Sequence, residues 1–122
     1  CNVGDGDEVI VSSCSVHSSA GAIISVGAKP IFVDIDSKSL NLDPNDVQKK
    51  LSKKTKAILV VHLWGNPAKM DLIISIAKKN NLKIIEDCAQ SAGSFYKGMP
   101  SGFSWRFSSF FILSYKNFRC IW

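Results

Sequence analysis

The chain has 122 residues, 46% of them hydrophobic and 20% charged, a composition typical of a globular protein that forms one domain or part of one. No apolar run approaches the roughly 20 residues that a membrane-spanning helix needs, so we expect no membrane contact. The net charge of +5 is uneven: the last twenty residues carry three cations and no acid, which leaves +2 for residues 1–102 and argues against a nucleic-acid partner.

The first half of the chain alternates strand-like and helix-like segments. Residues 7–12 (DEVIVS) are expected to form a short apolar strand, and the small apolar residues 18–26 suit a helix packed closely on a sheet. Residues 30–35 (PIFVDI) are the next expected strand. A helix is expected over residues 43–51, because an acidic N-cap followed by proline is a helix-start signal.

The second half continues the alternation. Residues 56–63 (KAILVVHL) are a continuous β-rich run, as expected for a strand buried on both faces. Residues 67–79 space their apolar side chains along one helical face, and residues 82–86 form a fourth expected strand. This order predicts an α/β fold with a mostly parallel sheet, flanking helices and right-handed crossovers. Such sheets usually have more strands, so we expect the chain to be a fragment of a larger domain.

The four cysteines lie far apart, and none forms a C-x-x-C pair or a metal-ligand spacing with the two histidines. We therefore expect no metal site and no disulfide framework. The pattern is typical of reduced, mostly buried thiols in a cytoplasmic protein.

The segment IIEDCAQ (84–90) places the carboxylate of Asp87 where a buried strand is expected to end. In open parallel sheets, ligands bind beyond the carboxyl ends of strands. One use of a carboxylate there is to hold a pyridinium nitrogen protonated, as in enzymes that use pyridoxal phosphate (PLP). An aspartate at a strand end is also a common helix cap or turn residue. Asp87 alone leaves both interpretations open.

Four sequence blocks, taken together and in order, resemble the nucleotide-sugar aminotransferases of PLP fold type I, the DegT–StrS type. The blocks are GDGDEVIV (4–11), VGAKPIFVDID (26–36), KTKAI with VHLWGNPAKMD (within 54–71) and IEDCAQS (85–91). The resemblance is collinear over about residues 4–102. It implies that residues 1–102 are a fragment of the large PLP-binding domain of such an enzyme.

The resemblance also implies roles for individual residues. Asp87 would pair with the pyridine nitrogen of PLP, and Gln90 would contact the side of the cofactor that carries the phenolic oxygen. The family usually stacks an aromatic residue on the PLP ring, and this chain has Val16 at that position with His17 beside it. We expect either that His17 stacks on the ring or that Val16 contacts it alone, and an ordinary loop or helix-start role for His17 is also open. His62 is expected to be structural or to line the site.

After Gly102 the resemblance ends abruptly. Where the family continues with G-D-F, F-S-F-Y-P-T-K and L-G-A, this chain has WRF, FFILSYK and FRC. Reading each codon one nucleotide later can restore the family sequence almost throughout. We therefore expect residues 103–122 to be out of frame, through a frameshift or a sequencing error, and a diverged but genuine tail is the alternative.

Lys116 is the only lysine of this tail, and it lies where the family has its Schiff-base lysine. An AAA codon survives the shift of frame, so a lysine persists in both readings. By the resemblance, Lys116 would be the catalytic lysine, which bonds the cofactor and later moves a proton.

The function that the resemblance implies is that of a PLP-dependent aminotransferase. Its parent would be a cytoplasmic homodimer that moves an amino group from an amino acid, often glutamate, to a nucleotide-linked keto sugar. One alternative is an inactive truncated remnant with no PLP binding or turnover. Another is a non-enzymatic α/β module such as a receiver-like domain, but that would need an acidic cluster at the end of the first strand, where Ser12, Ser13 and Cys14 stand.

Overall fold

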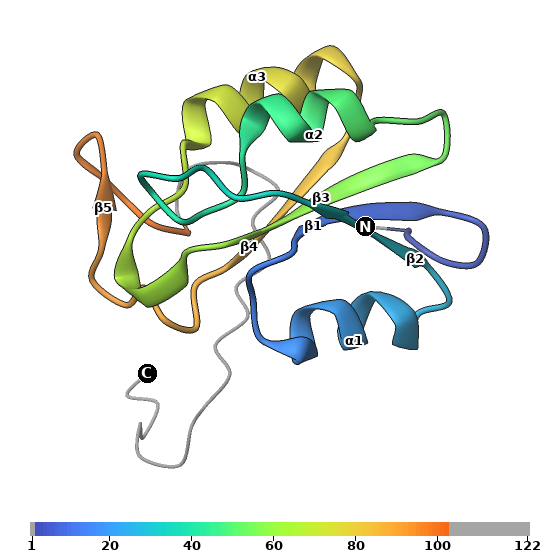
Figure 1. Ribbon diagram of the computed structural model, residues 1–122, viewed down its shortest axis with the longest axis horizontal. Helices are drawn as coiled ribbons and strands as arrows, with labels where there is room; N and C mark the ends of the chain where they lie inside the picture. Colours follow the sequence, from blue (N-terminus) through green and yellow to red (C-terminus); the bar gives the residue numbers. More distant parts are fainter. Residues whose placement is uncertain (1, 103–122) are drawn as a thin grey trace.

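The structure, a computed structural model, describes residues 2–102, which form a four-stranded parallel sheet with helices on both faces, followed by a small hairpin (Figure 1). The strands are β1 (Glu8–Ser12), β2 (Lys29–Val33), β3 (Thr55–Val61) and β4 (Lys83–Asp87), in the spatial order β2-β1-β3-β4. The helices are α1 (His17–Ser25), α2 (Pro44–Lys50) and α3 (Met70–Lys79). The predicted α/β class with a mostly parallel sheet is confirmed.

Helix α1 covers one face of the sheet, and α2 and α3 cover the other (Figure 1). The chain winds from β1 outward to β2 through α1, and then reverses, passing through α2 to β3 and through α3 to β4. Because crossovers between parallel strands are right-handed, a reversal of winding direction moves the helices to the opposite face. The reversal falls between β1 and β3. Open α/β sheets bind their ligands at the place where the winding reverses, beyond the carboxyl ends of the strands.

The hydrophobic core is divided between the two faces of the sheet. The larger part lies under α2 and α3, and its buried strand residues include Ile10, Ile58, Val60 and Ile84. The smaller part lies on the α1 side and consists of Val9, Val11, Ile23, Ala28, Ala57 and Leu59. Successive residues of a strand point to opposite faces, so apolar residues in consecutive positions are buried on both sides.

The connection between β3 and α3 differs from the sequence-based expectation. The predicted helix over residues 67–79 begins only at Met70. Before it the chain makes a single 3₁₀ turn, η1 (Leu63–Gly65), and an irregular stretch over residues 66–69. The buried side chain of Asn41 holds this connection: its Oδ1 accepts the Leu63 N–H at 3.1 Å, and its Nδ2 donates to the Asn66 carbonyl at 2.8 Å. By contrast, the predicted start of α2 is confirmed, since the Asp43 carboxylate accepts the Asn45 N–H at 3.0 Å.

A short hairpin that the sequence analysis did not predict follows β4. It pairs β5 (Phe95–Tyr96) with β6 (Met99–Pro100) through a two-residue turn. Both turn residues, Lys97 and Gly98, have positive φ, as tight hairpin turns of type I′ require. Among residues 2–102 there is no helix with the length and apolar character needed to cross a bilayer.

Candidate functional site

Asp87 is the last residue of β4, and its side chain is 7% exposed. Its Oδ1 accepts the Ala89 N–H at 3.0 Å, and its backbone carbonyl accepts the His62 N–H at 3.2 Å. Within the described residues, no cation pairs with Asp87 and no hydrogen bond reaches its Oδ2. Burying a carboxylate without a cation is unfavourable, so Asp87 is a candidate for contact with a ligand.

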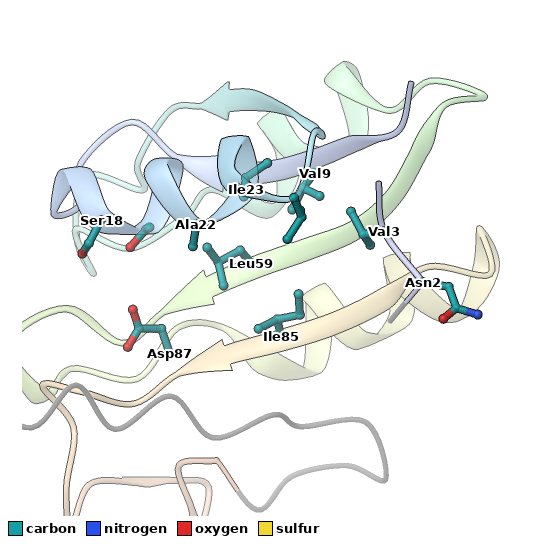
Figure 2. A pocket seen from close by; sticks show the side chains of 11 residues that line it. Asn2, Val3, Val9, Ser18, Ala22, Ile23, Leu59, Ile85 and Asp87 are labelled. Carbon is teal, nitrogen blue, oxygen red and sulfur yellow. The ribbon is translucent and has the colours of Figure 1, made fainter. Parts of the chain in front are cut away.

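The Asp87 carboxylate lies at one end of a cavity of about 320 Å³ that runs beside α1 over β1, β3 and β4. Figure 2 shows this carboxylate at the end near Ser18, whereas Asn2 and Val3 lie at the far end. The lining is mostly apolar and comprises Asn2, Val3, Val9, Ser18, Ser19, Ala22, Ile23, Val26, Leu59, Ile85 and Asp87. A single buried carboxylate in an apolar wall suits a flat ring that carries a protonated nitrogen.

Gln90 lies in the loop after β4, at the same edge of the sheet. Its side-chain Oε1 accepts the backbone N–H of Trp64 at 2.9 Å, which joins this loop to the 3₁₀ turn after β3. Because the oxygen is engaged, the orientation of the amide is set. Within the described part of the chain, its Nε2 makes no hydrogen bond, so Gln90 offers a donor at this edge.

Of the predicted site residues, Asp87 is the one that lines the cavity within residues 2–102, and Gln90 lies outside its lining. His17 is the exposed first residue of α1, directly before Ser18, and neither His17 nor Val16 lines the cavity. Stacking by His17 therefore stays a prediction. Lys116 lies outside the described residues, so its position also stays a prediction.

A buried cluster of His62, Glu86 and Cys88 was not foreseen. One ligand atom of each residue lies within 4.8 Å of the others, and all three side chains are buried. His62 Nε2 is 3.1 Å from Glu86 Oε2, and the Gly102 N–H donates to the same carboxylate oxygen at 2.9 Å. The available signal was Glu86 itself, a charged residue inside an apolar strand that must find partners.

The geometry of this cluster does not suit a metal ion. The Ala68 N–H donates to His62 Nδ1 at 3.1 Å, so Nδ1 carries no proton. A neutral imidazole that bound a metal through Nε2 would carry its proton on Nδ1, facing the Ala68 N–H. The three side chains are better described as a hydrogen-bonded cluster.

Comparison with known proteins places the chain in a family. The family model described as the DegT/DnrJ/EryC1/StrS aminotransferase family matches residues 1–121. The chain belongs to this family. The resemblance inferred from the four sequence blocks is thus confirmed, and with it the assignment of the fold to that of PLP-dependent aminotransferases.

Members of the DegT/DnrJ/EryC1/StrS family with curated names match most of this chain. It is 46% identical over 100 residues to GDP-perosamine synthase of Escherichia coli O157:H7, covering 82% of this chain and 28% of that protein. It is 48% identical over 101 residues to dTDP-3-amino-3,6-dideoxy-alpha-D-galactopyranose transaminase of Aneurinibacillus thermoaerophilus, covering 83% of this chain and 28% of that protein. The chain thus spans about a quarter of the length of these relatives.

A solved family structure has the same fold. It is the PLP form of the putative sugar aminotransferase Spr1654 from Streptococcus pneumoniae, with 33% identity and a TM-score of 0.82. The match covers 88% of this chain and 31% of that structure.

Proposed function

We propose that this chain is part of the large domain of a PLP-dependent aminotransferase that moves an amino group from an amino acid, often glutamate, to a nucleotide-linked keto sugar. Membership of the family supports the aminotransferase activity, and the names of two relatives, a GDP-sugar synthase and a dTDP-sugar transaminase, support the substrate class. The observation that carries the proposal is the buried Asp87 carboxylate, which has no cation partner among residues 2–102, in a mostly apolar cavity. The complete enzyme would be a cytoplasmic homodimer.

The donor set at the carboxyl edge fits PLP. Asp87 would hold the protonated ring nitrogen through a charge-assisted hydrogen bond, which is strong in an apolar wall. Gln90 would donate from Nε2 to the phenolic oxygen, because its Oε1 is already engaged by the Trp64 N–H. Leu59 and Ile85, which line the cavity, would keep water from the carboxylate. When bound, PLP supplies an electron sink for the carbon that loses its proton.

The remaining residues of the proposed site come from the resemblance. His17, one residue before the cavity-lining Ser18, would stack on the ring. Lys116 would bond the cofactor and then carry the proton between the substrate carbon and the cofactor. We also propose that residues 1–102 are a fragment of the large domain and that residues 103–122 are out of frame.

Cofactor chemistry is tested by incubating the purified chain with PLP. We expect a new absorbance band from PLP bonded to the chain. Borohydride should make that bond permanent, and peptide mapping should assign the resulting mass increase to Lys116. The matched control is Lys116→Arg, which keeps the positive charge and cannot form the bond. If neither PLP binding nor the adduct is seen with wild-type chain, the inactive truncated remnant becomes the better description.

The proposed frame of residues 103–122 is tested on the nucleotide sequence of the source DNA from the Pro100 codon onward. We expect the next frame to encode G-D-F, P-T-K and L-G-A. A shifted frame without these motifs would establish the given tail as authentic and remove the main support for Lys116.

A further inference from the structure

The buried cluster under the carboxyl end of β4 has no part in the chemistry proposed above, although it is adjacent to Asp87. We propose that His62 is held as a neutral imidazole with its proton on Nε2, and that His62 and Glu86 form a positioning pair that fixes the Asp87 carboxylate. The role given to Asp87 rests on the proposed function. The arrangement of the pair rests only on the contacts described below.

The protonation state follows from the two hydrogen bonds of the imidazole ring. The Ala68 N–H points at Nδ1 from 3.1 Å, and an N–H can only donate, so Nδ1 must accept. The proton of a neutral ring then lies on Nε2, which is 3.1 Å from Glu86 Oε2 and donates to it. An imidazolium would place a second N–H against the Ala68 N–H. The backbone of the connection between β3 and α3 therefore selects one tautomer.

The charges around His62 act in both directions. Burial lowers the pKa of the imidazole, whereas the neighbouring Cys88 and Glu86 side chains raise it, to about 9 overall, which by itself would favour the imidazolium. The hydrogen bond from the Ala68 N–H to Nδ1 opposes that protonation. Cys88 and Glu86 are the titratable groups that face the ring among the described residues. We assign the neutral form because protonation of Nδ1 would exchange a buried hydrogen bond for two opposed donors. A buried donor left without an acceptor is unfavourable.

The pair is connected to Asp87 in two ways: by a backbone hydrogen bond from His62, which follows β3, and by the position of Glu86 directly before Asp87 in β4. The His62 N–H donates to the Asp87 carbonyl at 3.2 Å, while its imidazole binds the side chain of the preceding residue, Glu86. Glu86 and Asp87 point to opposite faces of the sheet, as successive strand residues do. Glu86 is also held by the Gly102 N–H at 2.9 Å. The contacts of Glu86 thus hold the carboxyl end of β4 from the face opposite the cavity. They thereby fix the direction of the Asp87 carboxylate on the cavity face.

The protonation state is tested by nitrogen NMR of the 122-residue chain with ¹⁵N-labelled histidine. We expect His62 to give one pyridine-type and one pyrrole-type nitrogen signal, assigned to Nδ1 and Nε2, with no titration between about pH 6 and 8. His17, which is exposed, gives the other histidine signals in the same sample and serves as the reference for assignment. Two pyrrole-type signals for His62 at neutral pH, or a proton on Nδ1, would overturn the proposal. The measurement needs no variant and no PLP.

Positioning is tested by hydrogen exchange of the Ala89 amide, because its N–H donates to Asp87 Oδ1 and so reports where that carboxylate lies. Glu86→Met removes the acceptor and should speed Ala89 exchange at least about tenfold, the equivalent of one lost hydrogen bond. Glu86→Gln keeps an oxygen that can accept from His62 and Gly102, and should stay within about threefold of wild type. Ile58→Val, a core change on β3, controls for a general loss of stability.

The outcomes of the exchange experiment are distinct. Equal Ala89 exchange in Glu86→Met and Glu86→Gln, or equal acceleration in Ile58→Val, would show that the pair does not position Asp87. If Glu86→Met does not fold, two measurements remain. Ala89 exchange in Glu86→Gln beyond about threefold of wild type, or His62 nitrogen signals other than those expected above, would overturn the proposal. Failure of PLP to bind the wild-type chain would count against the proposed function and leave both of these results standing.

Discussion

The side-chain oxygen of Gln90 accepts the backbone N–H of Trp64 at 2.9 Å, and this bond joins the loops that follow β3 and β4. Trp64 is 70% exposed and has a φ of 53°, in the left-handed region that bulky residues rarely adopt. The bond thus fixes the Gln90 amide against an unusual backbone and leaves Nε2 as the group that can meet a ligand. The ligand-binding role proposed for Gln90 can therefore be tested apart from its structural role.

Gln90→Glu makes that separation. The glutamate keeps an oxygen for the Trp64 N–H but has no N–H to donate, so the loop should keep its form while PLP binding weakens. A net hydrogen bond contributes about 1 kcal/mol, so we expect the Kd of PLP to rise about fivefold or more by absorbance titration. The control is Gln48→Glu, the same change at an exposed position of α2. Unchanged PLP affinity in Gln90→Glu would remove Gln90 from the cofactor site.

Asp87→Asn should have opposite effects on stability and on binding. Without ligand, the amide avoids the cost of a buried carboxylate and can still accept the Ala89 N–H, so we expect urea unfolding to give a stability about 1 kcal/mol higher. The Kd of PLP should rise at least about tenfold, because a charge-assisted hydrogen bond contributes about 1.5–3 kcal/mol.

The control for Asp87→Asn is Asp43→Asn at the N-cap of α2, where asparagine and aspartate cap about equally well. This control should alter neither quantity. Lower stability of Asp87→Asn in the absence of PLP would mean that the carboxylate serves the fold and not a ligand.

The sequence predicted the parts of this fold that depend on local pattern. Apolar runs and the Asp-Pro start signal located four strands and three helices, and a carboxylate at a strand end pointed to Asp87. The His62–Glu86 pair could not be predicted in this way, because it depends on the register of β3 against β4, in which Val61 pairs with Asp87. The start of α3 was placed too early for a similar reason: Asn41, more than twenty residues away in the chain, holds the preceding turn.

Asn41 is the polar residue whose loss should most affect the site edge. Asn41→Ala leaves the Leu63 N–H and the Asn66 carbonyl without their partner inside the protein, and a buried unsatisfied group costs about 1–3 kcal/mol. We expect a loss of about 2–4 kcal/mol in urea unfolding. Asn45→Ala, the same change at an exposed position on α2, should cost less than about 1 kcal/mol. Equal losses in the two variants would contradict the role given to Asn41.

The hairpin after β4 is fastened to α3 by Asp71, and this contact should open in acid. Lys97 Nζ lies 2.7 Å from Asp71 Oδ2, and the Tyr96 hydroxyl donates to Asp71 Oδ1. The hydrogen bonds from Lys97 and Tyr96 lower the pKa of Asp71 to about 2. Because the pKa is lower in the folded chain, the stabilisation is complete above about pH 4, the unfolded value, and is lost as the pH falls through about 2.

The opening is measured by following the amide signals of Tyr96, Lys97 and Gly98 by NMR from about pH 5 to pH 2. We expect them to move together with a midpoint near 2, while the signals of β1 stay in place. In Asp71→Asn the same hairpin signals should be shifted already at neutral pH and should not titrate. A midpoint near 4 in the wild-type chain would mean that Asp71 is not engaged by Lys97 and Tyr96, and that the hairpin is held to α3 by packing alone.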